Sequence, residues 1–169
     1  MPLEIRPALG TLTAALASEH GLTGRPRPPQ NLHATLFSLG DFEIQQPELV
    51  AMARKLAAGV RARPFPVTWD RVKSLPREDR PQPLVLLGEE GVNGLAGLHE
   101  SFRIPLIERG IVKPASSRFM PHVTLLYDRQ TVDAQGITPV SWRVTEFVLV
   151  HSLLGQSRHI ILGRWPLRG

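Results

Sequence analysis

The chain has 169 residues, a net charge of +5 and no cysteine. The absence of thiols excludes disulfides, thiolate zinc sites and cysteine-ligated iron–sulfur clusters. No apolar run reaches the roughly 18–20 residues of a membrane span, and the start MPLEIRPALG lacks a secretory-signal pattern. We therefore expect a cytoplasmic protein with no membrane partner. Its arginine-rich charge fits a polyanionic partner and an ordinary solvated surface equally well.

Helices and strands are interspersed along the predicted chain. In order, the sequence predicts strand 3–6, helix 8–20, strand 31–37, helix 47–61, strands 65–75 and 83–88, helix 94–104, and strands 121–127, 143–152 and 159–167. The third helix should end near Pro105, and the last two strands should pair through Gly155. Because several strands are adjacent in sequence, the pattern favours an α+β fold with antiparallel sheets over a parallel, doubly wound sheet.

A proline- and arginine-rich connector, GRPRPPQ, joins the first helix to strand 31–37. Its prolines forbid helix and favour an extended surface loop. Arg25 and Arg27 in this loop could meet an RNA backbone, although exposed arginines commonly do nothing specific.

One motif occurs twice, as NLHATLF at 31–37 and as MPHVTLL at 120–126. Each copy places a histidine two residues before a threonine, with leucine next. Two such His-x-Thr-Leu tetrapeptides are expected about once per thousand shuffled sequences of this composition. A single histidine in a strand is ordinarily half-exposed and without function, but that explanation does not account for the repeat.

The repeat suggests acid–base chemistry. Residues i and i+2 of a strand point to the same side, so His33 with Thr35, and His122 with Thr124, each offer an imidazole and a hydroxyl to one space. Two imidazoles across a cleft can act as one general base and one general acid near neutral pH. The hydroxyls can donate hydrogen bonds to the oxygens of a phosphoryl group held between them.

The stretches NLHATLFSLGDF at 31–42 and RFMPHVTLLYD at 118–128 resemble the two-histidine (2H) phosphoesterases, in particular the bacterial 2′-5′ RNA ligase / RNA 2′,3′-cyclic phosphodiesterase family. The closing stretch at 147–167 is similar to that family's terminal strands. The resemblance implies a single bilobal α+β domain over residues 1–169. Two antiparallel sheets with helices outside would flank a central cleft that carries one His-x-Thr motif from each lobe.

The resemblance also implies an activity, namely metal- and cofactor-free hydrolysis of RNA 2′,3′-cyclic phosphate ends, or of small cyclic nucleotides, to 2′-phosphates. Some members also join RNA through a 2′-5′ bond. His33 would protonate the leaving 3′-oxygen, His122 would activate water, and Thr35 and Thr124 would hold the nonbridging oxygens. We expect a monomer.

Two positions depart from the family pattern. The aromatic residue expected five positions after the first histidine is Ser38, with Phe37 one residue earlier. The arginine found in some members five positions after the second histidine is Tyr127, with Arg129 two residues further on. Phe37, Tyr127 and Arg129 are therefore the candidate nucleotide contacts.

Two rival functions remain. One is a catalytically idle RNA-end-binding module with the same fold, although binding alone does not require two imidazoles. The other is a two-histidine metal site, which lacks the acidic partners and close histidine spacing of known zinc enzymes. Turnover of a cyclic nucleotide in excess EDTA distinguishes both from the phosphodiesterase.

Overall fold

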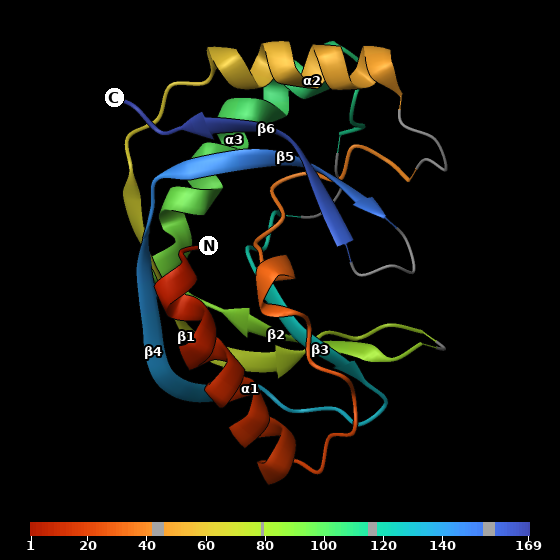
Figure 1. The fold of residues 1–169 in the computed structure, drawn as a ribbon, viewed down its shortest axis with the longest axis vertical. Helices are drawn as coiled ribbons and strands as arrows, with labels where there is room; N and C mark the ends of the chain where they lie inside the picture. The colour runs from red at the N-terminus through yellow and green to blue at the C-terminus, as the bar shows by residue number, and fades with distance from the viewer. Residues whose placement is uncertain (42–45, 79, 115–117, 154–157) are drawn as a thin grey trace. The chain divides into compact units, whose positions relative to one another are not determined.

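The computed structural model describes residues 1–41, 46–78, 80–114, 118–153 and 158–169 (Figure 1). The helices are α1 (Arg6–Glu19), α2 (Pro47–Gly59) and α3 (Asn93–Glu108), and the 3-10 turns are η1 (Leu3–Ile5), η2 (Pro29–Asn31) and η3 (Glu90–Val92). The strands are β1 (Phe65–Ser74), β2 (Gln82–Leu87), β3 (Val123–Asp128), β4 (Gln135–Val144), β5 (Glu146–Leu153) and β6 (Arg158–Pro166). The predicted α+β class with two antiparallel sheets is confirmed.

The chain divides into two compact units, each assembled from three separated segments. The first unit contains Met1–Thr35, Thr68–Val92 and Pro121–Trp142, and the second contains Leu36–Val67, Asn93–Met120 and Arg143–Gly169. Neither unit is a contiguous stretch of sequence. The single domain expected over residues 1–169 stays a prediction.

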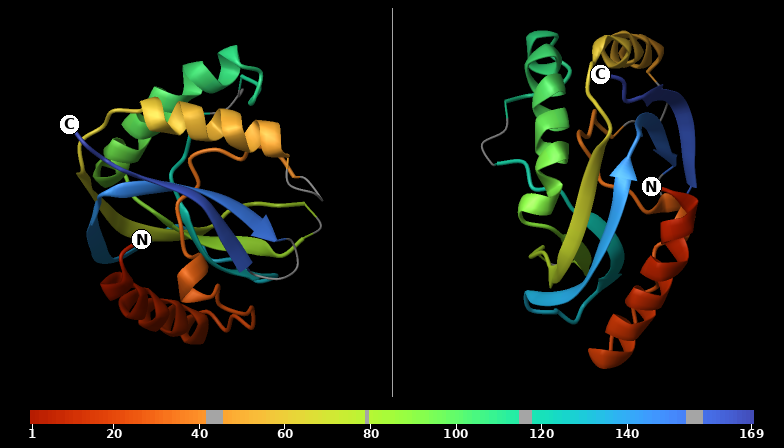
Figure 2. Two further views of the ribbon diagram at one scale, coloured as in Figure 1. Left: turned by 45° about the horizontal axis from the view of Figure 1, so that its top comes forward. Right: turned by 90° about the vertical axis from the view of Figure 1, so that its left-hand side faces the viewer.

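The first unit is a four-stranded sheet in the order β3-β2-β1-β4, with α1 alongside one face (Figures 1 and 2). Leu9 and Leu16 lie two helical turns apart on α1 and are both buried, as an amphipathic helix requires. The fully buried residues of the sheet include Val72, Leu84, Val85, Leu86, Val123 and Leu126. Trp69 is also fully buried and stacks on Trp142 with ring centroids 5.7 Å apart, as expected for a core residue.

The second unit combines the antiparallel pair β5–β6 with α2 and α3. Helix α2 contacts both α3 and β6. The Arg54 guanidinium donates from Nε to the Leu162 carbonyl at 2.8 Å, which ties α2 to β6. Phe147 of β5 packs edge-on against Phe102 of α3, with centroids 5.1 Å apart.

Two predicted strands at the N-terminal side were wrong. Residues 3–5 form a 3-10 turn that leads directly into α1, because Pro7 suits the first turn of a helix. Residues 31–37 do not form a strand. Asn31 ends η2, and only Ala34 makes a β-bridge.

The C-terminal half differs from the prediction in two further places. Helix α3 continues through Pro105 to Glu108, since buried Leu98 and Leu106 anchor it on both sides of the lost hydrogen bond. Strand β4 was missed because Gly136 and Pro139 argue against a strand, yet β4 is an edge strand, where proline is tolerated. Gly155, the predicted turn of the β5–β6 pair, lies outside the described residues.

Candidate active site

The two His-x-Thr motifs are paired with each other. Ala34, at the centre of the first motif, forms an antiparallel bridge with Val123, at the centre of the second. In an antiparallel pair this register sets His33 opposite Thr124 and Thr35 opposite His122. Both motifs belong to the first unit, so the expectation of one motif from each lobe was wrong.

All four motif side chains extend from one side of this bridge. Val123 is fully buried and shares the opposite side with Ala34, because neighbouring residues of an extended chain alternate. Residues directly opposite each other have Cβ atoms about 4.5–5.5 Å apart, and diagonal neighbours such as His33 and His122 are about 7–8 Å apart. That spacing leaves room for one small anion between the two imidazoles, with a threonine hydroxyl beside each.

His33 is oriented by the turn that precedes it. Its Nδ1 lies 2.6 Å from the backbone carbonyl oxygen of Asn31, and only a protonated Nδ1 can donate to that oxygen. Asn31 is itself buried at the end of η2. In the neutral imidazole this contact therefore fixes the proton on Nδ1 and leaves the basic lone pair on Nε2.

The surroundings of His33 favour its neutral form. The pKa of His33 is lowered, first by loss of hydration and further by the positive charges of Arg27 and His122. The hydrogen bond to Asn31 acts in the opposite direction and does not reverse the shift. The cations that influence His33 make this position electropositive, which suits a bound phosphate.

A β-bulge places Tyr127 on the side of the sheet that carries the motifs. Strand β2 pairs Val85 with Thr124 but Leu84 with Leu126, so β3 has one extra residue, Leu125. The alternation shifts there, and Thr124 and Tyr127 face the same side. The Arg77 guanidinium lies 5.9 Å from the centroid of the Tyr127 ring, within cation–π range.

The other two candidate nucleotide contacts differ in how open they are. Arg129 is exposed directly after β3. One face of Phe37 is covered by the imidazole of His99, with centroids 4.2 Å apart and planes 8° apart, and the far face of His99 stacks on Phe119 at 4.1 Å. These three rings all belong to the second unit.

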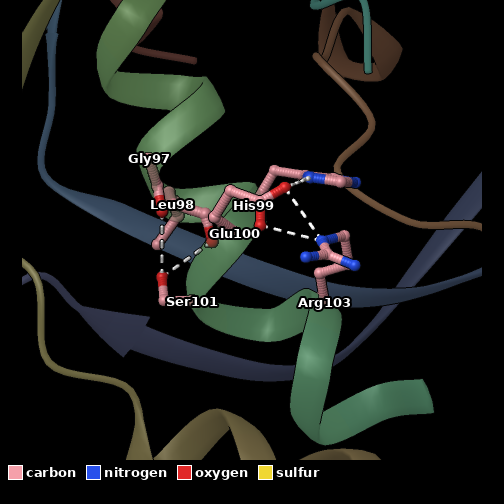
Figure 3. Close-up of polar contacts among 6 residues, drawn as sticks. All are labelled: Gly97, Leu98, His99, Glu100, Ser101 and Arg103. Carbon is pink, nitrogen blue, oxygen red and sulfur yellow. Dashed lines mark hydrogen bonds and ion pairs between the residues drawn. The ribbon is translucent and has the colours of Figure 1, made fainter. Parts of the chain in front are cut away.

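His99 is the central ring of that stack, and its side chain is only 13% exposed. Its pKa is lowered, first by loss of hydration, against the nearby Glu100 carboxylate, which raises it. Glu100 lies 3.7 Å from Nδ1 of His99 and also pairs with Arg103 at 2.8 Å (Figure 3). His99 therefore has a packing role in the second unit.

The end of β3 is clamped to the connector before the first motif by Asp128. One carboxylate oxygen accepts hydrogen bonds from the backbone N–H groups of Thr23 at 2.7 Å and Gly24 at 2.6 Å, and the other accepts from Gln130 at 2.8 Å. The Gln130 bond is the largest cause of the lowered pKa of Asp128, and Gly24 and Thr23 act in the same direction.

Sequence reasoning missed Asn31 and Asp128 as residues that position the motifs. Asn31 acts through its backbone carbonyl, which every residue type has, so its side chain gives no direct sign of this role. The one usable signal was an asparagine two positions before a histidine in a proline-rich turn. Asp128 is more than 100 residues from the loop it holds. Periodicity and spacing cannot show such a contact.

Among the described residues there is neither a metal-binding cluster nor a membrane-spanning helix. In residues 1–41, 46–78, 80–114, 118–153 and 158–169, no three His, Cys, Asp or Glu side chains gather as a metal-binding set. In the same ranges, no helix is both long and apolar enough to cross a membrane.

The chain is similar to one family model and to curated proteins that share one name. Residues 2–156 match the model of the 2′-5′ RNA ligase superfamily. The chain is 32% identical over 151 residues to the RNA 2′,3′-cyclic phosphodiesterase of Escherichia coli, which covers 85% of this chain and 80% of that protein. It is 31% identical over 117 residues to the protein of the same name from Aquifex aeolicus, and this match covers 66% of this chain but only 61% of the relative.

Solved structures show the same fold. The crystal structure of E. coli LigT in its apo form superposes with a TM-score of 0.79 at 30% identity, covering 100% of this chain and 94% of LigT. LigT complexed with phosphate superposes with a TM-score of 0.71 at 28% identity, covering 100% of this chain and 93% of LigT. The paired His-x-Thr motifs therefore stand in a chain that belongs to the 2′-5′ RNA ligase superfamily.

Proposed function

We propose that this protein is an RNA 2′,3′-cyclic phosphodiesterase that opens the cyclic phosphate at an RNA 3′ end and leaves a 2′-phosphate. The bridge between Ala34 and Val123 carries the proposal, because it brings two imidazoles and two hydroxyls to one side of a short antiparallel pair. The names of the relatives and the family match support the same substrate class.

The proposed chemistry is an in-line displacement at phosphorus. One imidazole takes a proton from water as the water oxygen attacks, and the other donates a proton to the 3′-oxygen as the P–O3′ bond breaks. The hydroxyls of Thr35 and Thr124 donate hydrogen bonds to the nonbridging oxygens, where negative charge is held in the transition state. No step needs a metal or cofactor, because the imidazoles carry both protons.

The roles of the two histidines are assigned from the surroundings of His33. The resemblance implies that His33 is the acid and His122 the base. The lowered pKa of His33 favours its neutral form instead, and the contact with Asn31 keeps the proton of that form on Nδ1. Neutral imidazole with an unprotonated Nε2 is the form a general base requires, so we assign the base to His33.

The nucleotide contacts belong to the same proposal. Tyr127 lies on the motif side of β3 with Arg77 over its ring, and the pair offers a base both a π-face and a positive charge. Arg129 follows directly after that strand. Phe37 belongs to the second unit, and His99 covers one face of its ring. Tyr127 is therefore the strongest candidate of the three.

Ligation uses the same site with a different nucleophile. If the 5′-hydroxyl of a second RNA attacks the cyclic phosphate in place of water, the product is a 2′-5′ linkage and the same 3′-oxygen leaves. The family name supports this as a second activity. Supplying an RNA with a 5′-hydroxyl and testing the joined product for resistance to 3′-5′-specific nucleases measures it directly.

The test of the proposed function is turnover of a nucleoside 2′,3′-cyclic phosphate in excess EDTA. We expect hydrolysis to a nucleoside 2′-phosphate at a rate that the chelator does not change. Binding without turnover would indicate the idle RNA-end-binding module. Loss of turnover in EDTA, with recovery on adding a divalent cation, would indicate a metal site.

A further inference from the structure

The proline-rich connector and the first motif each make a contact with the outer edge of β3. Strand β3 is an edge strand of the sheet. Pro26 bridges Leu126, and the Arg27 N–H donates to the Leu125 carbonyl at 2.7 Å. The chain then loops out through η2 and comes back to pair Ala34 with Val123. Arg27 and His33 thus lie opposite successive residues of β3, although they are six positions apart in sequence.

The register also fixes the side on which these arginines lie. Pro26 is exposed at the sheet edge, but because it lies directly opposite Leu126 it is on the same side of the sheet as that residue. Its neighbours Arg25 and Arg27 then extend to the other side by the alternation of an extended chain, taken across the bulge at Leu125. That is the side that carries both His-x-Thr motifs and Tyr127. Arg25 lies two residues further from the motifs than Arg27, a step of about 6.6 Å in an extended chain.

Both guanidinium groups are available to a ligand. Arg25 is exposed and Arg27 half-buried, and within the described part of the chain neither takes part in an ion pair with an acidic residue. The influence of Arg27 on the pKa of His33 agrees with a guanidinium on the motif side. A charged pair without acidic partners beside a phosphate site is suited to further phosphates.

The backbone that carries them is held in place before any ligand arrives. Pro26, Pro28 and Pro29 restrict the loop, and Pro28 is extended with φ −54° and ψ 134°. Gly24 packs so closely on β3 that an added Cβ would collide with the Tyr127 carbonyl group. Asp128 fixes the other side of this contact. Little conformational entropy remains to be lost when an RNA backbone binds.

We propose that Arg27 and Arg25 form a two-step track for the RNA backbone, in which Arg27 binds the phosphodiester next to the terminal nucleotide and Arg25 binds the following one. This inference rests on the proposed phosphodiesterase activity and narrows its substrate to RNA chains rather than free cyclic nucleotides. The track predicts a stepwise dependence of kcat/KM on substrate length.

The experiment compares three substrates with 2′,3′-cyclic ends: a mononucleotide, a dinucleotide with one phosphodiester, and a trinucleotide with two. For the wild-type protein we expect kcat/KM to rise roughly tenfold at each step, the scale of a charge-assisted hydrogen bond. Arg27→Ala should abolish most of the rise from mononucleotide to dinucleotide. Arg25→Ala should keep that first rise and lose the second.

Arg109→Ala is the matched control, since it also removes one exposed guanidinium, at the end of α3, and it should keep both steps. The salt dependence supplies a second measurement. The slope of log kcat/KM for the trinucleotide against log salt concentration should become shallower by about 0.7 for each arginine removed. This slope does not change if a variant merely loses stability.

Each outcome decides the question. Equal kcat/KM values for the three substrates, or unchanged length ratios in both arginine variants, would overturn the track while leaving the phosphodiesterase intact. An equal loss on all three substrates would place Arg27 at the cyclic phosphate itself and would also overturn it. If the wild-type protein turns over none of the three substrates, the proposed function fails, and the track that rests on it fails with it.

Discussion

Removing the charge of Asp128 should loosen the clamp between the proline-rich connector and β3. The two oxygens of the carboxylate accept hydrogen bonds from three backbone N–H groups. Asparagine has one oxygen and one NH2 group, so in either orientation an amide N–H faces at least one backbone N–H. One hydrogen bond is lost outright, and the others become bonds to a neutral acceptor.

The magnitude follows from typical values. A hydrogen bond to a charged group contributes roughly 1.5–3 kcal/mol and a neutral one roughly 0.5–1.5 kcal/mol. Losing one charged bond and weakening two, taken at the lower ends of these ranges, gives about 3.5 kcal/mol for Asp128→Asn. For a chain of this length, that corresponds to a fall in Tm of about 7–14 °C.

The assay is urea unfolding followed by tryptophan fluorescence, since Trp69 and Trp142 report on the unit that contains the clamp. Asp133→Asn, at an exposed position five residues further on, is the matched control and should change the unfolding free energy by less than about 0.5 kcal/mol. A similarly small change in Asp128→Asn would refute the proposed role of the clamp.

The pH dependence gives an independent check. The folded-state pKa of Asp128 is lowered, so its contribution is present above the unfolded pKa and is lost as pH falls through the folded value. The stability difference between the wild type and Asp128→Asn should therefore be constant between about pH 5 and 8. It should shrink only below about pH 4. A difference that changes near neutrality would point to a histidine instead.

Three further results are expected of the site. Thr35→Val and Thr124→Val should each lower kcat/KM on a cyclic nucleotide by roughly tenfold, the effect of one phosphate hydrogen bond, and normal rates would exclude the hydroxyls from the phosphate site. Because the pKa of His33 is lowered, the acid limb of the pH–rate profile should lie below pH 6.5, and Arg27→Ala should move it upward by removing a nearby positive charge; a limb that does not move contradicts this. The acid is identified with a substrate that has sulfur in place of the bridging 3′-oxygen, because a thiolate leaves without needing a proton. On this substrate His122→Ala should recover most of its lost rate and His33→Ala should not. The reverse pattern would make His33 the acid.

The sequence predicted the α+β class with two antiparallel sheets, and it singled out the two motif segments. The repeat of histidine, threonine and leucine identified two segments that prove to be paired at Ala34 and Val123. It did not reveal how they pair. The first motif lies in an irregular segment held to the edge of β3 by one bridge, and alternation over a few residues cannot be told from a true strand.

The remaining errors have one physical origin, which is that long-range packing overrides local preference. Pro139 is accepted in β4 because that strand lies at the sheet edge, and Pro105 is accepted in α3 because Leu98 and Leu106 are buried beside it. The bulge at Leu125, which moves Tyr127 to the motif side, depends on the register with β2. To predict any of these features, one must know which residues that are distant in sequence pack against the segment.

Paired, metal-independent histidine catalysis is tested most directly by one comparison. The wild type, His33→Ala and His122→Ala are assayed on a short RNA with a 2′,3′-cyclic end in excess EDTA, with chromatographic identification of the product. We predict a 2′-phosphate product from the wild type and at least about a hundredfold lower turnover from each variant, the usual scale of general acid–base catalysis. Near-normal turnover by either variant, or a wild-type rate abolished by EDTA, would contradict paired histidine catalysis.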